Sequence, residues 1–127
     1  ASKHSKRVLA IPSLGQARYL SAIKHAAAVV GNSSSGIIEV PSFNVPTVNI
    51  GERQKGRLAA ASVLHCEATT LAIQSSLKRA LNCNYKQDDV KTHNPYGKGN
   101  ASQQVISILK NLKFTVVKSF YDVKVTD

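Results

Sequence analysis

Three serines and a glycine interrupt an apolar region of the sequence, in VVGNSSSGIIEV of residues 29–40. An extended apolar pattern precedes the loop NSSSG and a short helical pattern follows it, so the N–H groups at the helix start have no partner within the helix. The helix dipole and these donors attract anions, and Gly36 lets a ligand approach the backbone closely. The loop therefore indicates a phosphate site built on Ser33, Ser34 and Ser35, or else a helix start that one serine caps. It is neither a P-loop nor a GxGxxG fingerprint.

Glu39 lies one turn into the same predicted helix. A carboxylate there would repel phosphate unless it faced another group. An ionised carboxylate accepts two O–H donors, which suits the neighbouring hydroxyls of a ribose. The competing interpretation is a solvent-facing glutamate that the helix dipole stabilises. Glu39 is therefore a candidate for sugar binding, and the case for this role depends on the residues around it.

Two arginines, Arg53 and Arg57 in GERQKGR, follow a predicted strand at the same edge of the sheet as the serine loop. A guanidinium there could neutralise a diphosphate, and ordinary surface arginines would give the same pattern. The segment PYGKGNAS places Asn100 near the cap of a later helix, which favours a tight turn over a second binding loop. The four histidines show no spacing typical of a metal site or a catalytic pair.

Apolar periodicity predicts the elements that position these residues. Strands are expected at residues 7–12, 28–31, 46–51 and 62–66, and helices at 15–27, 36–41, 69–81 and 101–113. Pro41 should kink or end the second helix because proline lacks an N–H donor. The third helix should direct four apolar side chains inward, namely Leu71, Ile73, Leu77 and Leu81. This alternation is typical of an α/β, Rossmann-like parallel sheet with helices on both faces, whose ligands bind beyond the carboxyl ends of the strands.

The composition limits the class of protein. With 127 residues, 43% of them hydrophobic, the chain suits one compact domain. No apolar run reaches the roughly 20 residues of a membrane span or forms a signal peptide, so a cytoplasmic protein is expected. A net charge of +10 would suit nucleic acid, but the basic residues are scattered and only four tyrosines and three phenylalanines could stack on bases. Cys66 and Cys83 lack ligand spacing, and Ala1 in a chain without methionine suggests a piece of a longer protein.

Three motifs together resemble the hydrolysing UDP-N-acetylglucosamine 2-epimerases of sialic-acid and related surface-sugar biosynthesis. These motifs are GNSSSGIIEVPSF, VPTVNIGERQKGR and NPYGKGNAS, in this order, and the resemblance covers about residues 7–113. Non-hydrolysing epimerases are similar but usually carry SGG-type loops in place of NSSSG, which favours the hydrolysing branch. The resemblance implies two Rossmann-like lobes of the glycosyltransferase-B type with the sugar nucleotide between them. Residues 1–113 would be the carboxyl-terminal nucleotide lobe and residues 114–127 a tail, with the amino-terminal lobe missing.

The resemblance also implies roles for individual residues. Ser33 and Ser34 would contact the pyrophosphate, Glu39 would hold the ribose hydroxyls, and Arg53 would meet the nucleotide. Leu14 would lie against the uracil through its backbone. Four further residues match motif positions as possible contacts without an assigned role: Ser35, Gly36, Arg57 and Asn100. Lys98 stands where relatives commonly have aspartate, so an acidic role for that loop is not expected.

The family's reaction removes the C2 proton of UDP-N-acetylglucosamine, expels UDP and hydrates the resulting glycal to N-acetylmannosamine. The resemblance places the catalytic carboxylates and histidine in the missing lobe, so no catalytic residue, metal or cofactor is expected in this chain. The chain alone should bind UDP weakly without turnover, and the relatives suggest a homodimer. Two alternatives stay open: the nucleotide lobe of a glycosyltransferase, which the products of the full-length protein would distinguish, and a basic nucleic-acid-binding module, which a salt titration would detect.

Overall fold

The computed structural model describes residues 7–82 and 93–113. The chain divides into two compact units, Ala1–Tyr96 and Gly97–Asp127. The predicted tail at residues 114–127 and Cys83 lie outside the described residues, and the predicted domain limit after Lys113 stays a prediction.

The first unit contains a parallel sheet, with helical elements before β1, between β1 and β2, and after β3. Its elements, in chain order, are α1 (Gly15–His25), β1 (Val29–Gly31), α2 (Ser35–Ile38), the 3-10 helix η2 (Val40–Phe43), β2 (Thr47–Ile50), β3 (Val63–Cys66) and α3 (Thr70–Asn82). The strand order is β1-β2-β3. Val30 lies opposite Val48, which in turn lies opposite Leu64. The α/β parallel sheet expected from the alternating pattern is therefore confirmed.

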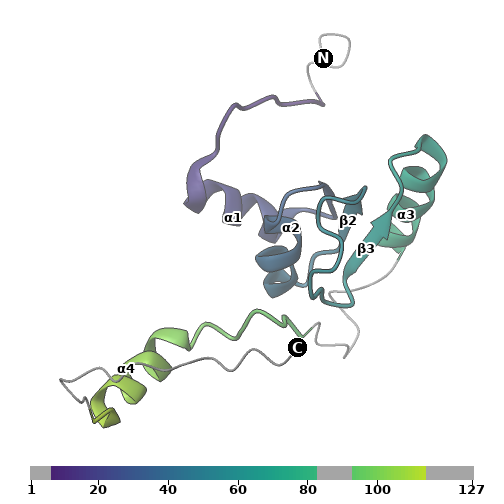
Figure 1. The fold of residues 1–127 in the computed structure, drawn as a ribbon. Coiled ribbons are helices and arrows are strands. Elements are labelled where there is room, and N and C mark those ends of the chain that lie inside the picture. Colours follow the sequence, from purple (N-terminus) through teal and green to yellow (C-terminus); the bar gives the residue numbers. More distant parts are fainter. Residues whose placement is uncertain (1–6, 83–92, 114–127) are drawn as a thin grey trace, which may run out of the picture. The chain divides into compact units, whose positions relative to one another are not determined.

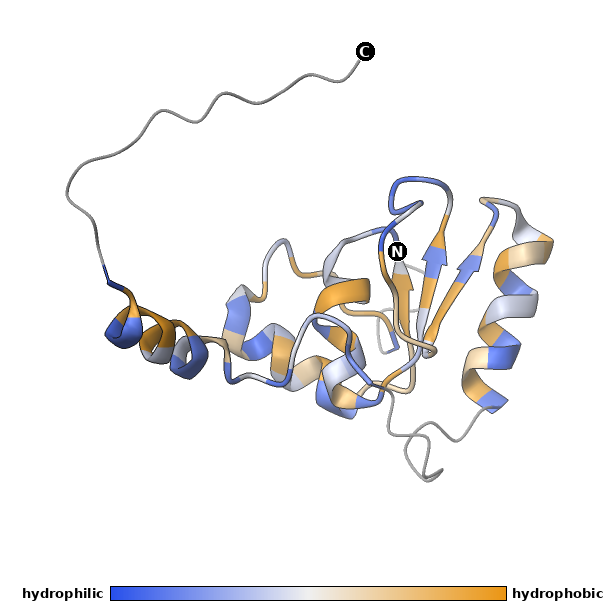
Figure 2. Ribbon diagram, turned by 60° about the horizontal axis from the view of Figure 1, so that its bottom comes forward, coloured by the Kyte–Doolittle hydropathy of each residue, from blue (hydrophilic) through white to orange (hydrophobic). Residues whose placement is uncertain are grey.

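Successive strand residues point to opposite faces of this sheet, and each face packs on helices. On one face Val48 and Leu64 form a buried cluster with Ala80 of α3. On the other face Val29 packs against a cluster that includes Ile23 of α1 and Val40 of η2. Figure 1 shows α3 on one side of the strands and α1 and α2 on the other. The sheet is thus covered on both faces, as predicted, and the polar residues towards the carboxyl ends of β2 and β3 stand out against its apolar body (Figure 2).

The turn between α2 and η2 follows the prediction for Pro41. The α-helical hydrogen bonds of α2 stop at Glu39, and the chain continues as a 3-10 helix that contains Pro41. Proline has no N–H to donate to a regular α-helix, so the tighter turn accommodates it. As a result α2 is only four residues long, and its dipole is weaker than that of a longer helix.

The strand predicted at residues 7–12 is wrong. These residues have no strand structure and are exposed, and Leu9 is 84% exposed. A strand requires a neighbour for its backbone N–H and C=O groups. Within the described residues, the pairs of this sheet join only β1 to β2 and β2 to β3, so the apolar pattern of residues 8–11 has no sheet partner.

The buried face predicted for α3 is also wrong in part. Leu71 is 80% exposed and Leu81 is 55% exposed, whereas Ser76 and Ala80 are buried and Leu77 packs against the core. Ile73 is half-buried, so the inward positions 73, 76, 77 and 80 have the spacing of one helix face. Small side chains at 76 and 80 let the helix lie close to the sheet, a feature that apolar periodicity alone does not reveal.

The second unit contains the helix α4 (Ala101–Asn111) in its described residues. This confirms the helix predicted at 101–113, with an end two residues earlier. Asn100 is its N-cap residue, but its side chain makes no capping hydrogen bond. The apolar side chains at positions 105, 106, 108 and 109 are exposed, and α4 has no buried residue.

Candidate functional site

The serine loop leaves the carboxyl end of β1 and enters α2 at Ser35, as the sequence pattern requires. Ser34 is the N-cap residue of α2, but its side chain makes no capping hydrogen bond. The backbone N–H groups of Gly36 and Ile37 donate to the carbonyl oxygens of Ser33 and Ser34 at 3.1 and 3.0 Å. The N–H of Ser35 donates to Ser33 Oγ at 3.4 Å. The expectation that the first helical N–H groups are free is therefore wrong for residues 35–37. The hydroxyls of Ser33 and Ser34 can still donate to a ligand.

The hydroxyl of Ser35 faces Glu39 and not the outside of the loop. Its Oγ donates a hydrogen bond of 2.5 Å to Oε2 of Glu39, one helical turn later. The same Oγ lies 2.5 Å from the phenolic oxygen of Tyr19 on α1. Glu39 itself is half-buried. The short turn of α2 thus fixes the orientation of its one carboxylate.

Gly36 brings α2 close to the sheet. Its carbonyl oxygen accepts a buried hydrogen bond of 2.7 Å from Thr47 Oγ1 on β2. A Cβ at position 36 would lie 2.8 Å from Thr47 Cγ2. Gly36 is buried, so the structure gives this glycine a packing role beneath the loop.

A pocket of about 520 Å³ lies beside Glu39. The residues that line it are Ile11, Pro12, Ser13, Leu14, Gly15, Gln16, Tyr19 and Glu39. Leu14 precedes α1 as its N-cap residue. The pocket thus places Leu14 beside the carboxylate of Glu39, which the hydrogen bond from Ser35 orients. Both residues were predicted from the resemblance as nucleotide contacts.

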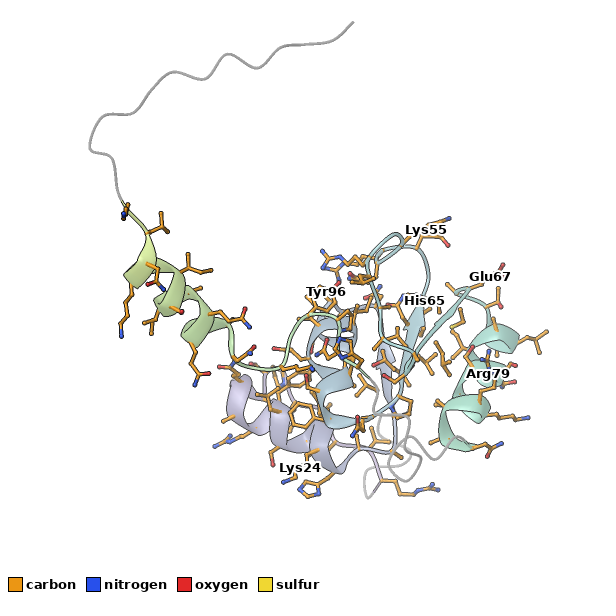
Figure 3. The ribbon with its side chains drawn as sticks, turned by 90° about the horizontal axis from the view of Figure 1, so that it is seen from below. Lys24, Lys55, His65, Glu67, Arg79 and Tyr96 are labelled. Carbon is orange, nitrogen blue, oxygen red and sulfur yellow. The ribbon has the colours of Figure 1, made fainter. Side chains whose placement is uncertain are left out.

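A second pocket, of about 370 Å³, lies at the carboxyl ends of β2 and β3. Its lining residues are Gly51, Glu52, Lys55, Gly56, Arg57, His65, Cys66 and Glu67. Figure 3 shows Lys55, His65 and Glu67 at this end of the lobe and Lys24 far from it. The hydrogen bond and charge of Glu52 raise the pKa of Lys55, and both side chains of this ion pair are exposed. An exposed pair adds little to stability.

The structure does not bring all the predicted site residues into one pocket. Ser33, Ser34 and Arg53 line neither of the two pockets, and Arg57 lines the second pocket and not the first. Arg53 and Arg57 are exposed on the loop after β2. Asn100 belongs to the second unit. Leu14, Ser35 and Glu39 are the predicted residues that the fold places together.

Gln54 joins the arginine loop to the serine loop. Its Nε2 donates a hydrogen bond of 2.9 Å to the carbonyl oxygen of Asn32, and the side chain is only 3% exposed. The sequence pattern does not point to Gln54, because its neighbours Arg53 and Lys55 are charged and the segment has the composition of a solvated loop. A buried glutamine in such a loop gives no signal in the hydropathy pattern.

Asn49 is a second buried amide at this edge of the sheet. It lies opposite His65 in the register of β2 and β3, and its Nδ2 is 3.0 Å from Nδ1 of His65. Asn49 is 1% exposed. Its Oδ1 and the Oε1 of Gln54 have no hydrogen-bond partner among the described residues. Buried polar groups usually have hydrogen-bond partners, so two buried oxygens without one are an unusual feature of this edge of the sheet.

We expect Gln54→Ala to lower the free energy of unfolding by about 1–2 kcal/mol, because the substitution removes a buried hydrogen bond and leaves the Asn32 carbonyl without its donor. Urea unfolding of the two proteins measures the difference. Gln74→Ala, at an exposed position on α3, is the matched control and should change stability little. Equal stability of Gln54→Ala and the unmodified protein would contradict the assigned contact.

The described residues contain no group of three or more His, Cys, Asp or Glu side chains arranged to hold a metal ion. In the same residues, no helix has the length and apolar character needed to cross a bilayer.

The parallel sheet, the helices on both faces and the polar loops at the strand ends define a Rossmann-like α/β lobe. The family model described as UDP-N-acetylglucosamine 2-epimerase matches residues 1–110. This chain belongs to that family, whose fold is of the glycosyltransferase-B type.

Curated proteins of bacteria are similar to the chain. Polysialic acid biosynthesis protein P7 of Escherichia coli is 40% identical over 108 residues, which cover 83% of this chain and 28% of that protein. GDP/UDP-N,N'-diacetylbacillosamine 2-epimerase (hydrolyzing) of Campylobacter jejuni is 46% identical over 69 residues, which cover 54% of this chain and 18% of that protein. UDP-N-acetylglucosamine 2-epimerase of Neisseria meningitidis is 37% identical over 76 residues, which cover 60% of this chain and 20% of that protein. The chain therefore spans less than a third of the length of these relatives.

Proposed function

We propose that this chain forms the UDP-binding part of a hydrolysing UDP-N-acetylglucosamine 2-epimerase, which converts UDP-N-acetylglucosamine to N-acetylmannosamine and UDP. The observation that carries the proposal is the pocket that joins Leu14 to Glu39. Membership of the epimerase family supports a sugar nucleotide as the ligand. The word hydrolyzing in the name of the Campylobacter relative supports the hydrolysing branch.

In this proposal each end of the nucleotide meets a different kind of group. The uracil lies against Leu14, and the carboxylate of Glu39 accepts hydrogen bonds from the ribose hydroxyls, since an ionised carboxylate is a pure acceptor. The hydroxyls of Ser33 and Ser34 donate to the pyrophosphate. Arg53 approaches the same phosphates and shares their charge, as a guanidinium does well. Ser35 donates its hydroxyl hydrogen to Glu39 and does not contact the phosphates.

The chemical steps require groups that this proposal does not assign to the chain. Removal of the C2 proton, expulsion of UDP and hydration of the glycal need positioned acids and bases. The described carboxylates are Glu39, which the proposal assigns to the ribose, and the exposed Glu52 and Glu67. We assign the acid and base to an amino-terminal lobe of a longer protein. The present chain stabilises the departing UDP through the hydroxyl donors of Ser33 and Ser34 and the guanidinium of Arg53.

Titration of the chain with UDP tests the proposal, with heat or amide NMR shifts as the readout. We expect weak, saturable binding without release of N-acetylmannosamine. Ser34→Ala and Arg53→Ala should each weaken UDP binding, whereas Arg79→Ala on α3 is the control and should not. The absence of UDP binding would contradict the proposed function, and turnover by the chain alone would contradict the proposed division of labour.

A further inference from the structure

Tyr19, Ser35 and Glu39 form a chain of hydrogen bonds along one wall of the pocket. The phenolic oxygen of Tyr19 lies 2.5 Å from Ser35 Oγ, and this Oγ lies 2.5 Å from Glu39 Oε2. The three groups come from two elements, because Tyr19 is on α1 and the others belong to α2 and its cap. Tyr19 and Glu39 both line the pocket. Nothing in the sequence pattern links Tyr19 to the site, since it lies 16 positions before Ser35.

The direction of each hydrogen bond follows from the donors available. An ionised carboxylate has no hydrogen to donate, so the single hydroxyl hydrogen of Ser35 goes to Glu39. Ser35 can then only accept from Tyr19, whose phenol donates. The order is Tyr19 to Ser35 to Glu39, and hydrogen bonds in such a series polarise and strengthen one another.

The packing of Tyr19 fixes the end of this chain of hydrogen bonds that lies away from Glu39. The ring of Tyr19 packs against the buried cluster of Ile23, Val40 and Val45, so the phenol is held by the core of the lobe. Ser35 is held by the backbone of α2, where its carbonyl oxygen accepts from Glu39 N at 2.9 Å. One oxygen of Glu39 is therefore anchored. Its other oxygen, Oε1, remains for a ligand.

We propose that Tyr19 is a positioning residue, which acts through Ser35 to orient the Glu39 carboxylate and so makes the pocket select ribonucleotides over 2′-deoxyribonucleotides. This inference rests on the proposed function, because it assumes that Glu39 accepts from ribose hydroxyls. An anchored carboxylate presents its free lone pairs at a fixed place, and two neighbouring hydroxyls can use them. A sugar without the 2′ hydroxyl loses one of these hydrogen bonds.

The test compares UDP with 2′-deoxyuridine diphosphate by calorimetric titration of the 127-residue chain. The unmodified chain should prefer UDP. Tyr19→Phe keeps the ring and removes the phenolic donor, and we expect it to weaken UDP binding by about 3–10-fold, the range of one hydrogen bond. Binding of the deoxynucleotide should weaken less than binding of UDP, because it keeps only the hydrogen bond from its 3′ hydroxyl to the oriented carboxylate, so the preference for UDP should narrow.

Matched variants separate positioning from a general structural effect. Tyr96→Phe removes another phenolic hydrogen bond, to the Leu58 carbonyl, and should leave both affinities unchanged. In a Glu39→Gln background, Tyr19→Phe should have a much smaller effect, since the two residues act as one unit. Ser35→Ala should repeat the selectivity loss of Tyr19→Phe, which keeps the test decisive if one variant folds poorly in thermal melts.

The outcomes divide cleanly between the two proposals. If UDP binds and Glu39→Gln weakens it while Tyr19→Phe and Ser35→Ala leave the preference for UDP intact, the inference is wrong and the proposed function stands. Equal weakening of both nucleotides by Tyr19→Phe would also overturn the inference. If the unmodified chain binds neither nucleotide, both proposals fall.

Discussion

Glu39→Gln is expected to weaken UDP binding by about 10–100-fold, which corresponds to the loss of charge-assisted hydrogen bonds worth about 1.5–3 kcal/mol. Glutamine has nearly the same volume and keeps an oxygen that can accept from Ser35, so the wall of the pocket should stay intact. What the variant loses is the negative charge and the oxygen that remains for the ribose, because an amide nitrogen, which only donates, takes the place of Oε1. Calorimetric titration with UDP measures the change directly.

Glu67→Gln is the matched control for this prediction. Glu67 is an exposed carboxylate that lines the other pocket, at the end of β3. The same change of charge there should leave UDP affinity nearly unchanged, because a distant exposed charge is screened by salt. A large loss in Glu67→Gln together with normal binding by Glu39→Gln would move the nucleotide to the second pocket and contradict the account.

Gly36→Ala is expected to lower the free energy of unfolding by about 1–3 kcal/mol, the usual cost of overpacking a filled interior. The added Cβ would meet Thr47 Cγ2 at 2.8 Å. The sign of the effect is informative, because alanine is favoured over glycine in a helix by about 1 kcal/mol. A helix free of this contact would be stabilised by the substitution. Urea unfolding of the variant decides between the two.

Thr47→Ser provides the rescue for Gly36→Ala. Serine removes the methyl group that the new Cβ would meet and keeps the hydroxyl that donates to the Gly36 carbonyl. The double variant should therefore be more stable than the two single effects predict, since residues in contact do not act additively. If the single changes simply add, the close approach of α2 to β2 is not the cause of the instability.

The sheet could be predicted from the sequence because each strand carries a local signal. Short apolar runs mark β1, β2 and β3, and Gly or Pro bounds β1 and β2. A helical pattern separates β1 from β2, and a charged loop separates β2 from β3. Residues 7–12 carry the same apolar signal but pair with no strand in the part of the chain that the structure describes, and pairing is a property of the whole sheet. The buried face of α3 was harder to predict because small residues, Ser76 and Ala80, face the sheet in place of Leu71 and Leu81.

The candidate site was predictable only where a motif carried it. The resemblance to the epimerases named Leu14 and Glu39, which the fold places in one pocket. The direction of the Ser35 hydroxyl could not be predicted from the sequence, because nothing in a run of three serines shows which hydroxyl contacts a ligand. Tyr19 and Gln54 act through contacts across 16 and 22 positions of the chain, and such contacts depend on how α1 and the loop after β2 pack.

The central claim is that uridine diphosphate binds in the pocket between Leu14 and Glu39. Amide NMR spectra of the chain, recorded during titration with UDP, test this most directly because each residue reports its own change. We predict that the largest shifts fall on Leu14, Gly15 and residues 33–39. Shifts confined to His65, Cys66 and Glu67, with Leu14 and Glu39 unchanged, would contradict it.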